Sequence, residues 1–356
     1  MSRPSIYFGA DALDELGNLY PDRGFHILRI PEISNAEMKK IHSSLQGRIL
    51  SETIYQRGMP DIESIQQLQN DFWRHAHCEN SVILGIGGGS VMDAAKVMRF
   101  KPNGIAWLSN NLDRPIEDRN AQKIPLLLAS TTAGTGSEVT PTATIWDFVK
   151  QRKHSFFGSQ VLANVAIVDP HLCLGAPWIL SRDAAIDALS HALEAIWNRN
   201  STEETSHLAI YAADKICHYL PLLRNNLDNL EIREQLSEAA LSAGLAMAQT
   251  QTALAHALSY AQTATNKQSH GQSCAYWLPY VWQMLIQSNC DPDVLASLNK
   301  AVGKYFRDPT EMQQWLLTLG FSVYPPLESD KELEEQVGIV RLSTRGRNFL
   351  GFDIND

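Results

Sequence analysis

The stretch Ser81–Lys96, SVILGIGGGSVMDAAK, decides the fold class of this chain. Its first six residues form a continuous apolar run, which predicts a strand buried on both faces of a sheet. Three glycines follow directly, and the apolar spacing from Val91 to Phe100 predicts a helix. Such a turn lets backbone N–H groups approach a phosphate closely. The stretch therefore predicts a parallel α/β sheet, with either a phosphate-binding loop or a plain tight turn at this point.

Similar patterns lie on both sides of this stretch. Residues 25–30, 124–129 and 165–168 read as further buried strands, and residues 62–76 have helical spacing. Strands that alternate with helices in this way predict an open α/β sheet with parallel strands.

The pattern changes to long helices from Ser181 onward, and Ser181 itself is the expected N-cap of the first one. The segment Asp169–Pro177 contains two prolines and a glycine, which favours a domain boundary there. We therefore expect an α/β nucleotide-binding domain over residues 1–178 and an all-helical domain over residues 179–356.

Composition excludes several classes of protein. The 356 residues are 44% hydrophobic and 19% charged, which argues against wholesale disorder. The net charge of −9 speaks against binding of nucleic acid or of an acidic membrane surface. Five cysteines without a CxxC pair suggest a reducing compartment. No leader peptide or membrane span is evident, so we expect a cytoplasmic enzyme acting on small molecules.

A second loop rich in donors follows the predicted strand 124–129. It reads TTAGTGSE over Thr131–Glu138 and combines two glycines with four hydroxyl side chains. By itself it could hold ribose or phosphate oxygens, or simply be a solvated loop. Two such loops at the carboxyl ends of neighbouring parallel strands lie where open α/β sheets bind ligands.

A third group of residues suits a metal. Asp187 and His191 are four residues apart on a predicted helix and so share one face. His256 and His270 follow later, and one carboxylate with three imidazoles suits iron(II), zinc or manganese. An isolated Asp–His pair is more often a surface hydrogen bond. The surrounding sequence IDALSHALEAI is apolar, however, and a buried pair needs a partner for its charge, which a metal supplies.

These pieces, in this order, resemble the iron-containing (metal-dependent) alcohol dehydrogenases from Ile6 to about Pro279. Within that family, three segments look most like the phosphonoacetaldehyde reductases, also called 2-hydroxyethylphosphonate dehydrogenases: Thr131–Asp147, Asp187–Asn198 and Thr252–Tyr260. The resemblance implies an N-terminal dinucleotide-binding domain, a C-terminal helical metal domain and an active site between them.

The resemblance also implies roles for individual residues. The implied metal ligands are Asp187, His191, His256 and His270. The implied contacts to NAD or NADP are Gly87, Gly88, Gly89, Ser90 and Asp93 in the first loop, Thr131, Thr132, Thr135 and Ser137 in the second, and Lys153 at the nicotinamide ribose.

Three departures from the family pattern bear on the chemistry. Tyr260 stands where many relatives have another histidine; its phenol titrates near about 10 but could still relay a proton. The segment Leu28–Pro31 lacks the acid that would bind a ribose 2′-hydroxyl, so NADPH is permitted. Lys267, in a polar loop before His270, is the nearest cation in sequence for an anionic substrate group. Arg345 and Arg347 near the C-terminus are further candidates if they fold back onto the cleft. All three could instead be solvated surface charges, which is the favoured interpretation for the two arginines.

The function that follows is hydride transfer between a nicotinamide cofactor and a small aldehyde or alcohol, assisted by a divalent metal. We expect iron(II) as the metal, phosphonoacetaldehyde as the substrate and a homodimer as the assembly. Two alternatives remain open at this point. One is a general short-chain, polyol or sugar alcohol dehydrogenase of the same fold, and the other is an inactive binding or assembly protein.

Overall fold

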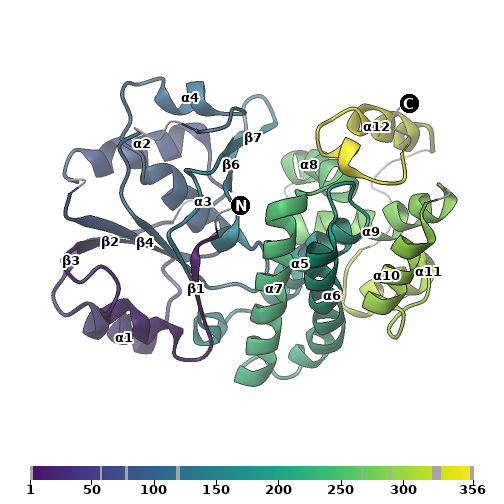
Figure 1. Cartoon of the computed structure of the whole chain (residues 1–356), viewed down its shortest axis with the longest axis horizontal. Helices are drawn as coiled ribbons and strands as arrows, with labels where there is room; N and C mark the ends of the chain where they lie inside the picture. The colour runs from purple at the N-terminus through teal and green to yellow at the C-terminus, as the bar shows by residue number, and fades with distance from the viewer. Residues whose placement is uncertain are drawn as a thin grey trace. The chain divides into compact units, whose positions relative to one another are not determined.

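The computed structural model describes residues 3–56, 58–76, 79–117, 121–266, 268–288, 290–322 and 330–352. The chain divides into two compact units, which are drawn in Figure 1. The first comprises Met1–Thr132 and Ser137–Leu174, and the second comprises Ala133–Gly136 and Gly175–Asp356. The sequence predicted one division after residue 178. The division seen here lies after Leu174, and the short segment Ala133–Gly136 belongs to the second unit.

The first unit contains a six-stranded sheet in which every paired neighbour is parallel. Its strands are β1 (Ser5–Phe8), β2 (Gly24–Arg29), β3 (Ile49–Ile54), β4 (Ser81–Gly87), β5 (Leu126–Ser130) and β8 (Val165–Val168). Their order across the sheet is β1-β8-β5-β4-β2-β3. The parallel α/β sheet predicted from the sequence is therefore confirmed, and β1 and β3 extend it at its two edges.

Helices cover both faces of this sheet. In Figure 1, α1 (Asn35–Leu45) lies on one side, and α2 (Ile62–Trp73), α3 (Gly89–Met98) and α4 (Trp107–Asn111) lie on the other. The central strand β4 is buried throughout because its side chains alternate between these two layers. The continuous apolar run in the sequence reflects this burial on both faces.

An antiparallel hairpin that the sequence analysis did not predict follows the second loop. Its strands are β6 (Thr142–Asp147) and β7 (Arg152–Phe157). Gln151 has a left-handed backbone conformation, with φ of 50°, where the chain turns back. The hairpin carries Lys153 opposite Trp146.

The described part of the second unit is helical. Its helices are α5 (Trp178–Ile196), α6 (Glu203–Leu223), α7 (Leu230–Thr250), α8 (Leu254–Asn266), α9 (His270–Gln287), α10 (Pro292–Val302), α11 (Pro309–Thr318) and α12 (Asp330–Arg341). Helix α5 packs against α6, α7 and α9, and its residues from Ala185 to Ile196 are all buried. Its central position in the bundle accounts for this burial on all sides, and its buried polar residues therefore need partners inside the unit.

The predicted N-cap at Ser181 was wrong, because the helix begins at Trp178, and the Ser181 hydroxyl lies within its first turn and donates to the Ala176 carbonyl. The short segment Ala133–Gly136 packs tightly in the same unit. A Cβ on Gly134 would lie 2.8 Å from the Ala184 side chain, and one on Gly136 would lie 2.6 Å from Gly244.

Candidate metal centre

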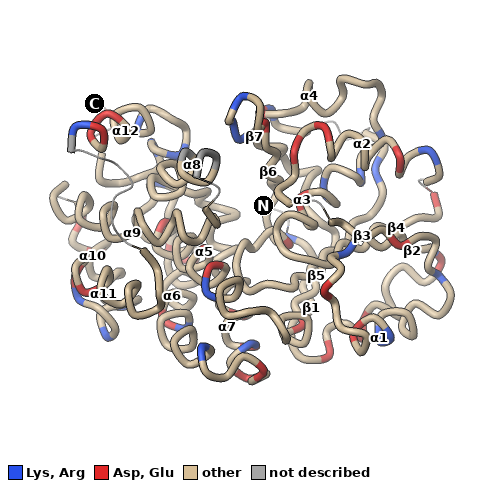
Figure 2. The backbone as a smooth tube through the Cα atoms, turned by 180° about the vertical axis from the view of Figure 1, so that it is seen from behind, with Lys and Arg blue, Asp and Glu red and all other residues tan. Residues whose placement is uncertain are grey.

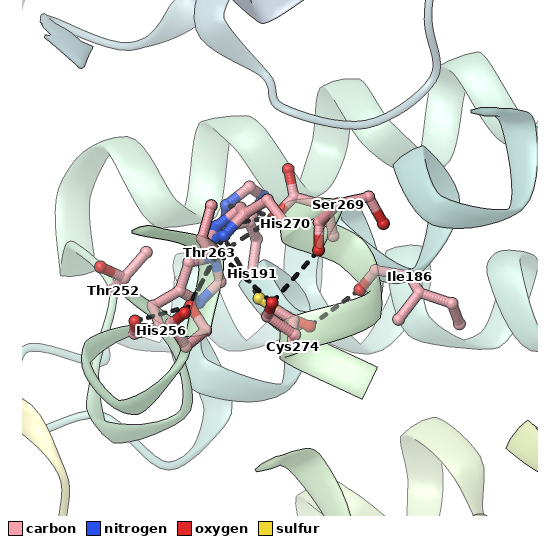
Figure 3. A network of polar contacts seen from close by, with 12 residues as sticks. Ile186, His191, Thr252, His256, Thr263, Ser269, His270 and Cys274 are labelled. Atoms are coloured by element: carbon pink, nitrogen blue, oxygen red, sulfur yellow. Dashed lines mark hydrogen bonds and ion pairs between the residues drawn. The ribbon is translucent and has the colours of Figure 1, made fainter. Parts of the chain in front are cut away.

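Four side chains from three helices converge inside the second unit. The Oδ1 atom of Asp187 lies 3.7 Å from Nε2 of His191, 3.4 Å from Nε2 of His256 and 3.5 Å from Nε2 of His270. Helix α5 supplies the first two residues, α8 supplies His256, and α9 begins with His270. Figure 3 shows the three labelled imidazoles gathered around one point. The four residues that the sequence predicted as ligands are thus brought together.

The geometry of this group fits a metal better than hydrogen bonds. Hydrogen bonds to a carboxylate oxygen are usually about 2.7–3.2 Å long, and all three distances to Asp187 Oδ1 are longer. Two ligand atoms bound at about 2.1 Å to one ion in a tetrahedral arrangement lie about 3.4 Å apart. Asp187 Oδ1 and His256 Nε2 are also buried and have no hydrogen-bond partner among the described residues. A divalent cation would satisfy both.

Glu194 holds one of these imidazoles in place, and the sequence analysis missed it. Its Oε2 accepts a hydrogen bond of 2.7 Å from Nδ1–H of His256. The other ring nitrogen, Nε2, therefore faces Asp187. The same carboxylate accepts the backbone N–H groups of Ala253 and His256, at 2.8 and 3.1 Å, and so satisfies free donors at the start of α8. A carboxylate on the second nitrogen of a ligating histidine fixes its tautomer and orientation.

His270 is positioned by close contact between α9 and α5. Ser269 caps α9 by accepting the N–H of Gln272, and its hydroxyl donates to Oδ2 of Asp183 on α5. Gly271 comes so near to α5 that a Cβ there would lie 2.0 Å from the Asp183 carbonyl oxygen. Only glycine fits at that position, which brings the first turn of α9, and with it His270, against the ligand helix.

The four predicted ligands differ in their electrostatics. Burial lowers the pKa of His256 and of His270, but neighbouring charges, first that of Cys274, outweigh it and raise both pKa values. Burial raises the pKa of Asp187, but interactions with the adjacent imidazoles of His191, His270 and His256 outweigh it, so that this pKa is below its ordinary value. Burial lowers the pKa of His191 to about 3, against the attraction of Asp187. At neutral pH, Asp187 is therefore ionised and His191 neutral. These are the protonation states in which the two side chains bind metals.

Two further side chains lie beside His270. The Tyr260 ring is nearly parallel to the His270 ring, with centroids 6.1 Å apart. The guanidinium carbon of Arg345 lies 5.6 Å from the centre of the Tyr260 ring, and its Nη1 donates to Oγ1 of Thr252. The C-terminal segment thus brings a cation near the ligand group. Lys267, the other predicted cation, lies outside the described residues.

The first predicted cofactor loop and the first two residues of the second, Thr131 and Thr132, are neighbours in the first unit. Gly87 at the end of β4 pairs with Ser130 at the end of β5, and the N–H of Thr131 donates to the Gly87 carbonyl at 3.1 Å. Gly88, Gly89 and Ser90 are partly exposed at the start of α3, and Thr132 is partly exposed as well. Thr135, by contrast, belongs to the second unit.

Glycine occurs at positions 87 and 88 of the first loop for different reasons. A Cβ on Gly87 would lie 2.6 Å from Val91 and 3.0 Å from Ile30, so packing alone excludes a larger residue there. A Cβ on Gly88 would meet nothing closer than 3.4 Å, and its φ of −77° suits any residue. Packing therefore does not account for Gly88, whereas close approach of a ligand would. The buried Oγ1 of Thr131 has no hydrogen-bond partner among the described residues.

Asp93, Lys96 and Ser137 form a buried polar network behind these loops. Asp93 accepts the Ser137 hydroxyl at 2.7 Å and the Thr144 N–H at 2.7 Å. Lys96 Nζ donates to Ser137 Oγ at 2.7 Å and to the Thr142 carbonyl at 2.6 Å. Burial raises the pKa of Asp93, while the nearby ammonium groups of Lys96 and Lys153 oppose that rise. The network joins α3 to the second loop and the hairpin, and it places Lys153 in the same region.

The surface outside these sites carries mixed charge. Figure 2 shows Lys and Arg interspersed with Asp and Glu along the described elements of both units. None of the described helices combines the length and the apolar character that crossing a bilayer requires.

Two family models match this chain in succession. The model "Iron-containing alcohol dehydrogenase" matches residues 4–170, and "Fe-containing alcohol dehydrogenase family, C-terminal" matches residues 182–333. The chain is 31% identical over 249 residues to the NAD-dependent methanol dehydrogenase of Bacillus methanolicus, an alignment that covers 68% of this chain and 63% of that protein. It is 32% identical over 202 residues to the phosphonoacetaldehyde reductase of Streptomyces viridochromogenes, covering 55% and 51%. These alignments thus span less than two thirds of either relative.

A solved structure shares the fold over nearly the whole chain. The sulfoacetaldehyde reductase from Bifidobacterium kashiwanohense, solved in complex with NAD⁺, superposes with a TM-score of 0.84 at 23% identity. The match covers 98% of this chain and 93% of that one. The two family models together match most of the chain, which therefore belongs to the iron-containing alcohol dehydrogenase family.

Proposed function

We propose that this chain is a metal-dependent, NAD(P)-linked alcohol dehydrogenase that reduces a small aldehyde. The observation that carries the proposal is the convergence of Asp187, His191, His256 and His270 at distances that suit a shared cation. These four residues would hold iron(II), or zinc or manganese. Bound there with a nicotinamide cofactor, the cation supplies polarisation of the substrate carbonyl, and the cofactor supplies the hydride.

The residues of this chain have separate tasks in that reaction. Asp187 contributes the negative charge of the ligand group, and Glu194 keeps Nε2 of His256 turned towards it. The cofactor pyrophosphate would lie against Gly88, Gly89 and Ser90, where backbone N–H groups at the start of α3 face an anion. The other predicted contacts in the first unit belong to the two loops, to α3 or to the hairpin: Gly87, Asp93, Thr131, Thr132, Ser137 and Lys153.

The substrate we favour is an aldehyde with an anionic group, with phosphonoacetaldehyde as the first candidate. Similarity to the phosphonoacetaldehyde reductase of Streptomyces viridochromogenes supports this choice. Arg345 supplies a cation beside Tyr260 and His270, and Arg is well suited to bind a phosphonate with two N–H groups. Tyr260 is the candidate for passing a proton to or from the substrate oxygen. We also infer a cytoplasmic homodimer.

The experiment measures metal content and NAD(P)H oxidation with phosphonoacetaldehyde and with propanal. We expect Arg345→Gln to raise KM for phosphonoacetaldehyde by about tenfold, which is about 1.4 kcal/mol, and to leave KM for propanal nearly unchanged. Arg347→Gln is the matched control, because Arg347 is exposed two residues away. Equal effects of Arg345→Gln on both substrates would reject its role in binding the anion. Absence of any aldehyde reduction by the metal-loaded protein would reject the proposed activity itself.

A further inference from the structure

A fifth potential ligand lies against the proposed metal centre. Cys274 is fully buried on α9, one helical turn after His270, and its Sγ forms a hydrogen bond of 3.7 Å with Nε2 of His270. The donor atoms of Asp187, His256, His270 and Cys274 all lie within 4.8 Å of one another. Figure 3 shows the sulfur next to the gathered imidazole nitrogens. We propose that Cys274 is a further ligand of the bound metal, through its thiolate sulfur.

The surroundings of the sulfur argue against a mere packing role. A buried cysteine often acts as a small apolar side chain in contact with other apolar groups. Here the sulfur faces polar donor atoms instead, and two of these, Asp187 Oδ1 and His256 Nε2, have no hydrogen-bond partner among the described residues. Sulfur bound at about 2.3 Å and nitrogen at about 2.0 Å to one five-coordinate ion lie about 3.7 Å apart when the angle between the two bonds is about 120°. The observed 3.7 Å is close to that separation.

Position along the helix supports the same conclusion. Cys274 follows His270 by four positions on α9, as His191 follows Asp187 on α5. Each helix therefore presents two donors on one face. On binding, the S–H bond breaks, the proton leaves to solvent and a sulfur–metal bond forms. A thiolate favours zinc and cobalt(II) over manganese(II), so Cys274 would shift the metal preference of the site. The proposed activity requires only the other four ligands and does not depend on this one.

The test uses the full-length protein loaded with cobalt(II). We expect a sulfur-to-cobalt charge-transfer band in the near ultraviolet, and X-ray absorption of the zinc form should show one sulfur at about 2.3 Å. Cys274→Ser and Cys274→Ala should lose both signals. The affinity for zinc should fall at least tenfold while the affinity for manganese changes little, because only zinc gains from a soft ligand. Cys217→Ala is the matched control, since Cys217 is a buried free cysteine on α6.

Spectra of the wild-type protein show whether sulfur binds the metal even if a Cys274 variant does not fold. Stoichiometric cobalt with no charge-transfer band and no sulfur neighbour would overturn the role of Cys274 and leave the proposed function intact. Failure of the wild-type protein to bind cobalt or zinc at all would overturn both proposals. A charge-transfer band that persists in Cys274→Ser, or that disappears in Cys217→Ala, would assign the sulfur to another residue.

Discussion

At the residue scale, Glu194 has two functions through one carboxylate. It orients the His256 ring and also accepts two backbone N–H groups at the start of α8. The ring orientation and the helix start therefore depend on the same buried charge. This dependence separates Glu194 from a more exposed glutamate of the same unit, such as Glu238, whose carboxylate interacts with the side chains of Lys215 and Tyr211.

We expect Glu194→Gln to weaken metal binding by about 10- to 100-fold, because the neutral amide holds the His256 tautomer less well. Competition with a chromogenic chelator measures this loss directly. Glu238→Gln serves as the control and should bind metal like the wild type. A Glu194→Gln protein with wild-type metal affinity would show that the ring is oriented by packing alone.

A substitution at Gly88 can test cofactor binding without destabilising the fold. Its backbone conformation suits alanine and its surroundings have room for a Cβ, so Gly88→Ala should change the melting temperature little. The same variant should weaken NAD(P)H binding at least tenfold, because the methyl group would stand where the pyrophosphate approaches. Gly87→Ala should instead lower stability by about 1–3 kcal/mol through overpacking. Calorimetric titration with each nucleotide, together with thermal melts, distinguishes the two; unchanged nucleotide affinity in Gly88→Ala would contradict the loop assignment.

At the element scale, the network around Lys96 connects three separate pieces of chain. Its ammonium group is fully buried and donates to the second loop and to β6, while Asp93 binds the same two segments from α3. Buried charge and hydrogen bonds therefore hold the hairpin β6–β7 and the second loop to α3, in addition to the apolar contacts that the hairpin and α3 share.

Removing the Lys96 ammonium group should destabilise the protein. We expect Lys96→Met to lower the free energy of unfolding by about 3 kcal/mol or more, because Asp93 would stay buried without its positive partner. Chemical denaturation measures the loss. Lys40→Met, which removes a partly exposed lysine that pairs with Asp14, should cost less than about 1 kcal/mol. Equal losses in the two variants would mean that the buried network adds nothing beyond a surface pair.

The sequence predicted some of these features and missed others for physical reasons. The strands of the parallel sheet were recognisable because burial on both faces produces long apolar runs, as in β4. The four predicted ligands converge in the structure, and their binding of metal remains a prediction. Glu194 was missed because its partners are about sixty positions away along the chain. Cys274 could have been noticed, since its spacing from His270 repeats that of Asp187 and His191.

At the scale of the whole molecule, the proposed metal ligands all belong to the second unit, whereas most of the cofactor residues belong to the first. Removing the metal should therefore destabilise the second unit more than the first. A ligand that binds only the folded state stabilises it by about 4 kcal/mol at a thousand times its Kd. We expect chelation to increase hydrogen exchange in α5, α8 and α9 and to leave β4, β5 and α3 nearly unchanged. Uniform loss of protection across both units would contradict this expectation.

The segment Ala133–Gly136 has a consequence for limited proteolysis. It belongs to the second unit, where its glycines leave room for Ala184 and Gly244, although the chain on either side belongs to the first. The two units are thus joined by three crossings of the backbone, and not by a single linker. Cleavage between Leu174 and Gly175 would not by itself release two fragments. The N-terminal fragment would still contain Ala133–Gly136, four residues that pack within the second unit.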